Sequence, residues 1–240
     1  CAYYSDVPQQ LSSVSFFCPA YCEEENLPEF IPKVHKFLSE NSRQFEIIIV
    51  NNGSHDRTGV TAENLAKQYR NIRVIHHPRN MGYGGALKTG FASARGDYDY
   101  VMYLDSDNQY DINEFNPHLH LLDQFDILSP YAAKKAITFP RKIQSFVYNL
   151  CLNTLFPLKL RDVNCSMKIY KKEVIKAIPI KSQSAFIDAE ILLKAKRAGF
   201  KIHQFPVTHF PRQKGKATGS HPSVIWETIK EMVKFRFGIF

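Results

Sequence analysis

Short apolar segments alternate with longer helical patterns along most of this chain, and that alternation limits the folds that it can adopt. Strands are predicted at residues 13–18, 45–50, 72–75, 98–104, 125–128, 167–170 and 201–207, and helices at residues 24–39, 58–69, 84–94, 139–156, 185–198 and 222–237. Strands that alternate with helices form crossover units, which build a mainly parallel sheet covered by helices. We therefore predict an α/β fold with one Rossmann-like, mostly parallel sheet flanked by helices, as a single domain over residues 1–240 that ends in amphipathic helices.

The size and composition of the chain suit a packed domain. Of its 240 residues, 44% are hydrophobic and 13% are aromatic, which is enough for a large core. The sequence contains neither an apolar stretch of membrane-spanning length nor a signal peptide. Its five cysteines lack the spacing of a zinc site or of a disulfide framework. We therefore expect reduced thiols in a cytoplasmic protein.

The positive charge of the chain is concentrated near its end. Lys and Arg number 31 against 23 Asp and Glu, and residues 191–240 account for the whole excess of eight. A basic region of this kind favours an anionic partner, such as a phosphorylated substrate or an acidic membrane surface. A solvated basic face is the alternative. No nucleic-acid-binding motif accompanies the charge, so we expect no nucleic acid partner.

Polar residues follow three of the predicted strands at the point where each strand ends. Residues 19–24 follow the first strand, residues 51–56 follow the second, and residues 105–109 follow the fourth. In open parallel sheets, ligands bind beyond the carboxyl ends of the strands. We therefore expect these three segments to converge on one site.

The segment D-S-D-N-Q after the fourth strand is typical of a metal site. Asp105, Asp107 and Gln109 bring several oxygen atoms together where a buried strand leaves its sheet. Oxygen ligands suit a hard divalent cation, and the sequence therefore predicts Mg²⁺ or Mn²⁺ at these three residues. An acidic turn without a metal is the alternative, because Asp and Asn are common turn residues.

Six segments extend this pattern from residue 14 to about residue 216. They read P-A-Y-C-E-E-E-N-L, I-I-I-V-N-N-G-S-H-D-R-T, N-M-G-Y-G-G-A-L-K-T-G, Y-L-D-S-D-N-Q-Y-D, R-D-V-N-C-S-M-K-I-Y and F-P-V-T-H-F-P-R-Q-K-G-K. Their order and spacing resemble the inverting family 2 glycosyltransferases of the GT-A fold, above all the dolichyl or polyprenyl phosphate sugar synthases. The resemblance implies a nucleotide-sugar half at about residues 13–130 and an acceptor half at about residues 131–240.

By this resemblance, the nucleotide sugar contacts the strand ends, a glycine-rich loop and a C-terminal basic loop. The implied residues are Pro19, Tyr21, Glu23, Asn51, Asn52, Ser54, Gly82, Asp105, Ser106, Arg212 and Lys216. The family usually has two acids where this chain has Asn51 and Asn52, and a carboxylate there accepts N–H bonds from the base. An amide both donates and accepts, so the sequence leaves UDP-hexose and GDP-hexose open. At Gly82, a plain turn before a helix is the alternative to a phosphate-binding loop.

The resemblance also implies which residues act in the transfer. It assigns catalytic roles to Asp105, Asp107, Asp188 and Arg212. A divalent cation would offset the charge of the leaving diphosphate. Arg141 and Ser145, four residues apart on one predicted helix, would bind the phosphate of a polyprenyl phosphate acceptor. A phosphate monoester is largely ionised at neutral pH, so it needs cations more than it needs a general base.

The predicted function is metal-dependent, inverting transfer of a hexose to a polyprenyl phosphate by a peripheral protein at the cytosolic face of a membrane. The amphipathic segments at residues 139–156 and 222–237 suit a membrane surface, and packing on the sheet is the alternative. A second candidate is transfer to a hydroxyl of a glycan or lipid, with Asp188 as general base. A third is a non-catalytic module that binds nucleotides or lipids.

Overall fold

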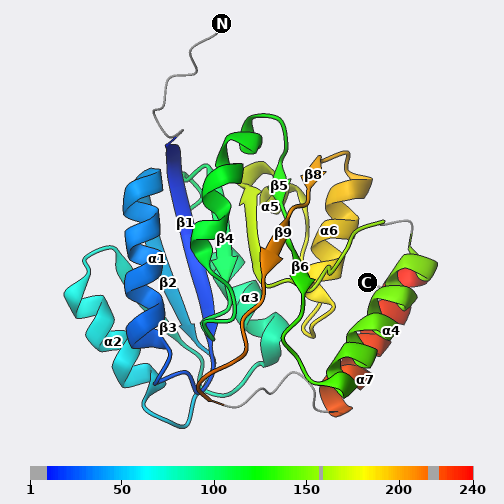
Figure 1. Cartoon of the computed structure of the whole chain (residues 1–240), viewed down its shortest axis with the longest axis horizontal. Helices are drawn as coiled ribbons and strands as arrows, with labels where there is room; N and C mark the ends of the chain where they lie inside the picture. Colours follow the sequence, from blue (N-terminus) through cyan, green and yellow to red (C-terminus); the bar gives the residue numbers. More distant parts are fainter. Residues whose placement is uncertain (1–9, 157–158, 216–221, 240) are drawn as a thin grey trace, which may run out of the picture.

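Seven strands pair into one central sheet in the part of the chain that the computed structural model describes, residues 10–156, 159–215 and 222–239 (Figure 1). The strands of this sheet and of a second, two-stranded sheet are β1 (Leu11–Ala20), β2 (Ser42–Asn51), β3 (Ile72–His76), β4 (Tyr100–Leu104), β5 (Ile127–Leu128), β6 (Tyr131–Lys134), β7 (Met167–Lys171), β8 (Ile202–His203) and β9 (Pro206–Thr208). The helices are α1 (Leu27–Asn41), α2 (Thr58–Gln68), α3 (Gly82–Ser93), the 3₁₀ helix η1 (Ile112–Asp123), α4 (Phe139–Leu155), α5 (Lys172–Ala177), α6 (Ile187–Arg197) and α7 (Pro222–Arg236).

The central sheet is mostly parallel and has the strand order β3-β2-β1-β4-β7-β5-β8. Only β7 runs against its neighbours, since it is antiparallel to both β4 and β5. The strands β6 and β9 form a separate parallel pair. The predicted α/β fold is confirmed, and the carboxyl ends of the parallel strands β1, β2 and β4 point to the same end of the sheet.

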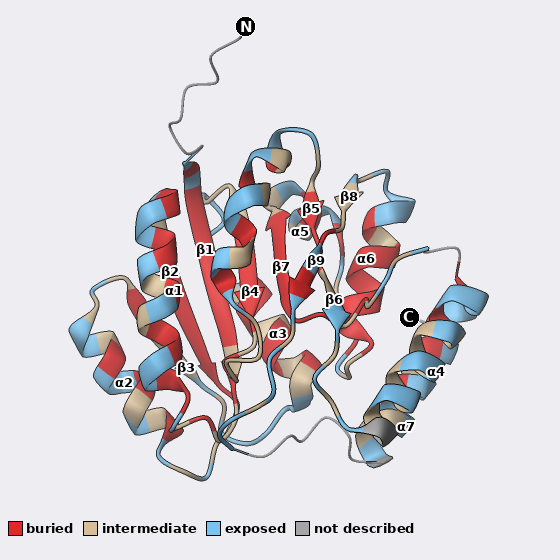
Figure 2. Ribbon diagram, viewed as in Figure 1, coloured by how far each residue is buried: buried red, intermediate tan, exposed pale blue. Residues whose placement is uncertain are grey.

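Successive side chains of the central strands face two different helical layers. Phe16 of β1 belongs to the core that includes α1, α2 and η1, whereas Phe17 belongs to the core that includes α3, α6 and α7. On β4, Met102 and Tyr103 divide between the two cores in the same way. Figure 2 shows that the central strands β1, β4 and β7 are mostly buried while the outer sides of the helices are exposed. Burial on both faces explains why these strands read as continuous apolar runs.

The prediction of one strand over residues 201–207 is wrong. Strand β8 ends at His203 and pairs with β5, whereas β9 begins at Pro206 and pairs with β6 in the other sheet. Pro206 has no backbone N–H, so it cannot continue a ladder through the middle of a strand. The sequence analysis also did not predict η1, β6 and α5, which are short or irregular and have no strong apolar period.

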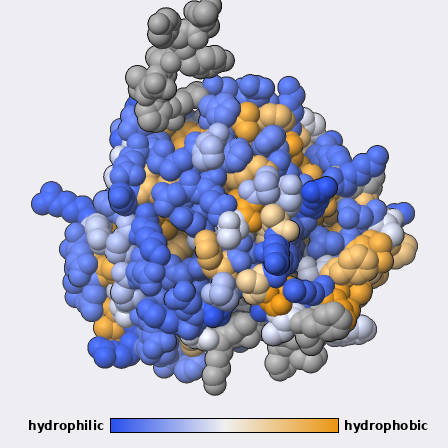
Figure 3. Space-filling view, viewed as in Figure 1, coloured by the Kyte–Doolittle hydropathy of each residue, from blue (hydrophilic) through white to orange (hydrophobic). Residues whose placement is uncertain are grey.

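The helices α4 and α7 lie side by side (Figure 1) and pack through aromatic side chains. The ring centroid of Phe235, on α7, lies 5.6 Å from that of Phe156, the C-cap residue of α4. It lies 5.4 Å from the ring centroid of Phe186, the N-cap residue of α6. Their outer faces are apolar, and Phe146 and Trp226 are 68% and 58% exposed. Figure 3 shows apolar side chains gathered over α4. None of the described helices combines the length and apolar character that crossing a membrane requires.

Glu190 joins α6 to the segment that precedes it. Its carboxylate accepts from the backbone N–H of Lys181 at 3.0 Å and of Ser182 at 2.8 Å, and it pairs with Lys194 at 2.5 Å. Burial raises the pKa of Glu190, but the hydrogen bonds from Lys194 and Ser182 outweigh it, so the net pKa is below its usual value. The ionised form of Glu190 therefore stabilises the fold.

Glu190→Gln should lower the free energy of unfolding by about 1–3 kcal/mol at pH 7, because it removes hydrogen bonds to a buried charge. A folded-state pKa below the unfolded value, about 4.3, means that this stabilisation is complete above pH 4.3 and is lost as the pH falls through the folded value. Urea denaturation at several pH values checks both points, and the difference between variant and wild type should shrink in acid. Glu227→Gln, in an exposed pair with Lys230, is the control and should change stability by less than about 0.5 kcal/mol.

Candidate active site

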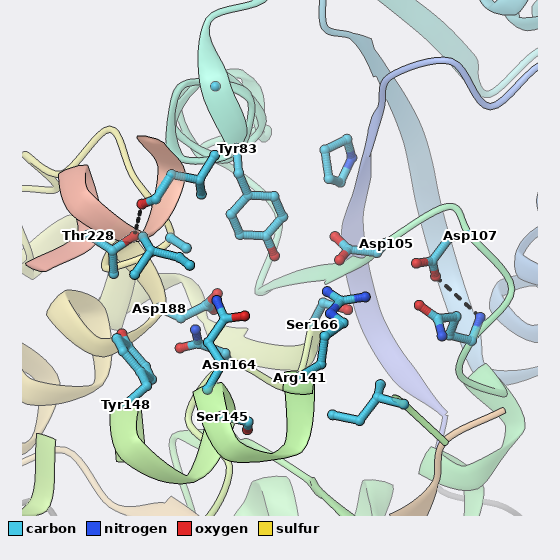
Figure 4. A pocket seen from close by; sticks show the side chains of 18 of the residues that line it. Tyr83, Asp105, Asp107, Arg141, Ser145, Tyr148, Asn164, Ser166, Asp188 and Thr228 are labelled. Atoms are coloured by element: carbon cyan, nitrogen blue, oxygen red, sulfur yellow. Dashed lines mark hydrogen bonds between the residues drawn. The ribbon is translucent and has the colours of Figure 1, made fainter. Parts of the chain in front are cut away.

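A cavity of about 830 Å³ opens where β1 and β4 end (Figure 4). The predicted site residues that line it are Pro19, Tyr21, Glu23, Asn52, Gly82, Asp105, Ser106, Asp107, Gln109, Arg141, Ser145, Asp188 and Arg212. Asn51 and Ser54 are not among its lining residues, and Lys216 lies outside the described residues. The structure thus brings residues from all three polar strand ends into one cavity, as a parallel sheet requires.

The acidic turn after β4 is held by local hydrogen bonds. Ser106 Oγ donates to the carbonyl of Pro19 at 2.8 Å, which ties the ends of β4 and β1 together. Asp107 Oδ1 accepts from the backbone N–H of Gln109 at 3.2 Å. Between them, Asn108 has a φ of 56°, a left-handed conformation that asparagine adopts more readily than most residues. The turn therefore holds both of its aspartates on the cavity wall (Figure 4).

The carboxylate of Asp105 is only partly compensated, because the hydrogen bond from Ser166 and the charge of Lys168 do not outweigh the effect of burial. Its Oδ1 atom has no hydrogen-bond partner among the described residues. Burial, and then the negative charge of Asp107, raises the pKa of Asp105 well above its usual range. Burial also raises the pKa of Asp107, against the opposing effect of Arg212. Two partly buried carboxylates with raised pKa values at one turn form a site whose charge a cation would offset.

The acidic turn fits a divalent cation that shares its ligands with a substrate. Within residues 10–156, 159–215 and 222–239, no three His, Cys, Asp or Glu side chains group together to hold a metal. Mg²⁺ is usually bound by one or two carboxylates together with water and substrate phosphates. The pair of Asp105 and Asp107, with the unpartnered Oδ1 of Asp105, fits that arrangement. The side-chain amide of Gln109 donates to the Phe210 carbonyl at 3.1 Å.

Arg212 lies across the acidic side of the cavity. Its Nη2 atom is 2.6 Å from Glu23 Oε1, and its Nη1 atom is 3.5 Å from Asp107 Oδ2. Its Nε atom donates to the carbonyl of Lys214 at 2.8 Å, which folds the basic loop back on itself. Gly215 has a φ of 71°, and a Cβ there would lie 2.9 Å from the guanidinium. This loop is therefore shaped around Arg212.

Asn51 is turned away from the cavity. Its Nδ2 atom lies 2.9 Å from His76 Nδ1, and its Oδ1 accepts from the backbone N–H of Ser54 at 3.2 Å. The hydroxyl of Ser54 in turn accepts from the backbone N–H of Cys22 at 3.0 Å. Asn51 and Ser54 thus hold the turn after β2 together, and their predicted contact with the nucleotide stays a prediction.

Asn52 lines the cavity, but its amide is occupied by the glycine-rich loop. Its Nδ2 atom donates to the Gly82 carbonyl and to Asn80 Oδ1, both at 3.1 Å. Its Oδ1 atom accepts from the backbone N–H of Met81 at 3.0 Å and contacts His77 Nδ1 at 2.8 Å. An aspartate could not make the two donor contacts. The amide of Asn52 therefore sets the shape of the loop that begins α3.

The predicted acceptor residues Arg141 and Ser145 lie on one face of α4 and both line the cavity. A second cation stands beside them, because Lys135 Nζ donates to Ser145 Oγ at 2.8 Å and pairs with Asp162. Figure 4 shows Arg141 and Ser145 facing the cavity from α4. The middle of the cavity therefore carries positive charge and a hydroxyl donor, whereas its β4 side is acidic.

Asp188, in the first turn of α6, is a buried anion with a buried counter-ion. Its side chain is 2% exposed, and Lys168 Nζ lies 2.8 Å from its Oδ1 atom. The Tyr103 hydroxyl donates to the same oxygen. Lys168 is itself fully buried and also donates to the Cys165 carbonyl. Asp188 is therefore fixed in place by two partners, and a proton taken by its Oδ1 atom would compete with both.

The sequence analysis did not single out Lys168, Tyr83 or Asn164. Tyr83 and Asn164 line the cavity, and Lys168 supports it from β7. One signal was available, since a lysine between Met167 and Ile169 in a buried strand must be paired. Which carboxylate pairs with it depends on how β7 and α6 pack, and that is not visible in the sequence.

Comparison with known proteins identifies the family. Residues 15–178 match the family model described as glycosyl transferase family 2. A dolichyl-phosphate beta-glucosyltransferase of Trichomonas vaginalis is 32% identical over 81% of this chain, and a dodecaprenyl-phosphate galacturonate synthase of Rhizobium johnstonii is 27% identical over 87%. The matched regions span 64% and 62% of the length of those two relatives.

Solved structures share the fold. Glucosyl-3-phosphoglycerate synthase from Mycobacterium tuberculosis, in complex with Mn²⁺, uridine diphosphate and glucosyl-3-phosphoglycerate, superimposes with a TM-score of 0.72 and 19% sequence identity. The match covers 95% of this chain and 80% of the synthase. Because the family model matches well over half of the chain and the fold agrees, this protein belongs to glycosyl transferase family 2.

Proposed function

We propose that this chain transfers a hexose, with inversion, from a UDP- or GDP-hexose to a polyprenyl phosphate, in a reaction that depends on Mg²⁺ or Mn²⁺. One observation carries the proposal. A single cavity joins the acidic turn at Asp105 and Asp107, the cationic wall at Arg141, and an apolar arm between α4 and α7. The names of the relatives from Trichomonas vaginalis and Rhizobium johnstonii, which refer to dolichyl and dodecaprenyl phosphates, support the same acceptor class.

The donor half of the site is built to hold a nucleoside diphosphate. In this proposal Asp105 and Asp107 hold the cation, with Gln109 beside them, and Pro19, Tyr21 and Glu23 line the nucleotide side. When bound, the cation neutralises charge that develops on the leaving diphosphate. Arg212 supplies a second positive charge at the same place, since it already lies against Glu23 and Asp107. Lys216 remains a predicted contact outside the described residues.

The acceptor half favours a phosphate as nucleophile. Arg141 and Ser145 present a guanidinium and a hydroxyl to the cavity, and Lys135 adds a second cation to Ser145. A phosphate monoester has a second pKa near 6, so at neutral pH it is mostly an anion that these groups bind and orient. No proton has to be removed before attack. The cations therefore do the work that a general base does for a hydroxyl acceptor.

The apolar arm of the cavity matches a long hydrocarbon chain. Its walls come from α4 and α7 and include Val147, Leu155, Val224, Ile229 and Val233. It continues outside as an apolar surface, which we define by the exposed residues Ile143, Phe146, Leu150, Trp226, Phe237 and Ile239. Exposed apolar side chains beside the basic residues of α7 suit the interface of an anionic membrane. This surface supports peripheral attachment to a membrane, and we propose the cytosolic face, as in the sequence analysis.

Asp105→Asn and Asp107→Asn should each reduce transfer of hexose to polyprenyl phosphate by at least about 100-fold, because each removes charge that holds the cation. The assay measures radiolabelled polyprenyl phosphate hexose formed with Mn²⁺ and UDP-glucose or GDP-mannose. Without metal, Asp105→Asn should raise Tm, since an ionised carboxylate with a raised pKa opposes folding. Asp111→Asn, just beyond the turn, is the control and should leave transfer unchanged. Full activity of both turn variants contradicts the proposal.

Asp188→Asn separates phosphate acceptors from hydroxyl acceptors. With a phosphate acceptor, initial rates at pH 7.5 should fall by no more than about tenfold, whereas loss of a general base costs about 10²–10⁴-fold. The variant leaves Lys168 buried without a counter-charge, so Lys168→Met with Asp188→Asn should be assayed beside it, with Tm measured for both. A loss beyond 1,000-fold in a folded variant would instead support the hydroxyl reaction.

The combined variant Phe146→Ser and Trp226→Ser should bind vesicles of phosphatidylcholine and phosphatidylglycerol at least about tenfold more weakly, because each buried aromatic side chain contributes about 1.5–3 kcal/mol. Sedimentation of the protein with vesicles measures the binding. Val60→Ser removes an equally exposed apolar side chain, 54% exposed, from α2 and should have no effect. Equal losses in both variants would show that the surface of α4 and α7 has no special part in binding.

A further inference from the structure

We propose that Tyr148, Asn164 and Asp188 form the subsite that binds the transferred sugar, and that this subsite selects an uncharged hexose. The inference rests on the donor half of the proposed function. All three residues line the cavity between the acidic turn and the apolar arm, and Figure 4 shows them around the same space.

The first observation is a group of buried polar atoms that lack partners. The Tyr148 hydroxyl, the Asn149 Oδ1 atom and the Asn164 Oδ1 atom are buried on the cavity wall, and none of them makes a hydrogen bond of ordinary geometry with a described residue. Burial raises the pKa of the Tyr148 hydroxyl, and the side chain of Asn164, which lies within hydrogen-bonding reach of it, lowers that pKa. Buried polar groups without partners are rare in native proteins, and several on one wall indicate a polar ligand.

The second observation is the position of the group. Tyr148 and Asn149 lie one helical turn beyond Ser145 on α4, so they stand next to the proposed acceptor phosphate. On the other side, the carbonyl of Ser166 accepts from the backbone N–H of Asp105 at 3.3 Å, which ties the segment of Asn164 to the acidic turn. A ligand that contacts both sides lies between the leaving diphosphate and the attacking phosphate. The transferred sugar must occupy that place.

Asp188 lies within electrostatic reach of both ends of this space. Its negative charge contributes to the raised pKa values of Tyr148 and of Asp105, after the larger effect of burial. Its Oδ1 atom is held by Lys168 and Tyr103, which fixes the direction of the carboxylate. Asp188 is therefore a preformed acceptor for a sugar hydroxyl, and Lys168 is a positioning residue that acts through it.

The chemistry of the wall determines the class of sugar. Asn149 Oδ1, Asn164 Oδ1 and the Asp188 carboxylate are acceptors, whereas the Tyr148 hydroxyl can donate or accept, so the wall as a whole favours a ligand that donates hydrogen bonds. The hydroxyls of a neutral hexose donate, but the C6 carboxylate of a hexuronic acid cannot. A hexuronate would also bring a negative charge near Asp105 and Asp188, and Lys168 is fully buried with its contacts already made. The subsite therefore favours glucose-like sugars over glucuronate-like ones.

Titration calorimetry of nucleotides in the presence of Mn²⁺ tests the subsite. The contribution of the sugar is the difference between the binding free energies of UDP-glucose and of UDP. Tyr148→Phe and Asn164→Ala should each lower the affinity for UDP-glucose by about tenfold and leave the affinity for UDP unchanged. If the chain prefers guanine nucleotides, GDP-mannose and GDP replace this pair. Tyr170→Phe is the matched control, since it removes a buried hydroxyl that also lacks a partner among the described residues but does not line the cavity.

UDP-glucuronate provides the second arm and should bind at least about tenfold more weakly than UDP-glucose in the wild type, as expected for one lost charged or polar contact. Equal binding of the two donors, or variants that weaken UDP and UDP-glucose alike, overturns the subsite. If the donors bind as expected but no sugar is transferred to polyprenyl phosphate, the proposed function is overturned and the subsite is retained. Failure of both nucleotides and both nucleotide sugars to bind would overturn both proposals.

Discussion

A fully buried lysine balances the charge on which the candidate active site depends. Lys168 lies in β7 with no exposed surface, and it contacts Asp188, the Tyr103 hydroxyl and a backbone carbonyl. An unpaired charge in such a place costs several kcal/mol, so each member of the pair requires the other. Asp188 is the third carboxylate in this region, after Asp105 and Asp107. Because Lys168 neutralises it, Asp188 adds no uncompensated negative charge near Asp105. The negative charge of the acidic turn is then available to the proposed metal.

The shape of the cavity explains how one fold can serve a water-soluble donor and a lipid acceptor. Its polar end is made by strand ends, where the backbone leaves the sheet and side chains such as Asp107 line the cavity. Its apolar end is made by α4 and α7, whose inner faces line the cavity and whose outer faces stay exposed. Arg141 stands on α4 between the two ends. A phosphate on a hydrocarbon chain matches that order of polarity.

Much of this architecture could be predicted because it follows from local patterns. Burial on both faces makes the central strands continuous apolar runs, and the residues that follow them must then lie at one end of a parallel sheet. The convergence of Glu23, Asn52 and Asp105 was foreseeable for that reason. The break between β8 and β9 was not, because Phe205 and Pro206 continue an apolar run whose partners belong to two different sheets.

The amino-acid sequence alone determined the layered α/β fold and the position of the acidic turn, because periodicity and spacing are properties of neighbouring residues, whereas the pair Arg141 and Ser145 was implied by the family resemblance. The tertiary structure decided what those residues contact. It turned Asn51 toward His76, and it placed Lys168 against Asp188 across two elements that are separate in the chain. Such contacts depend on how elements pack and on which buried polar groups find partners, and local sequence does not encode that choice.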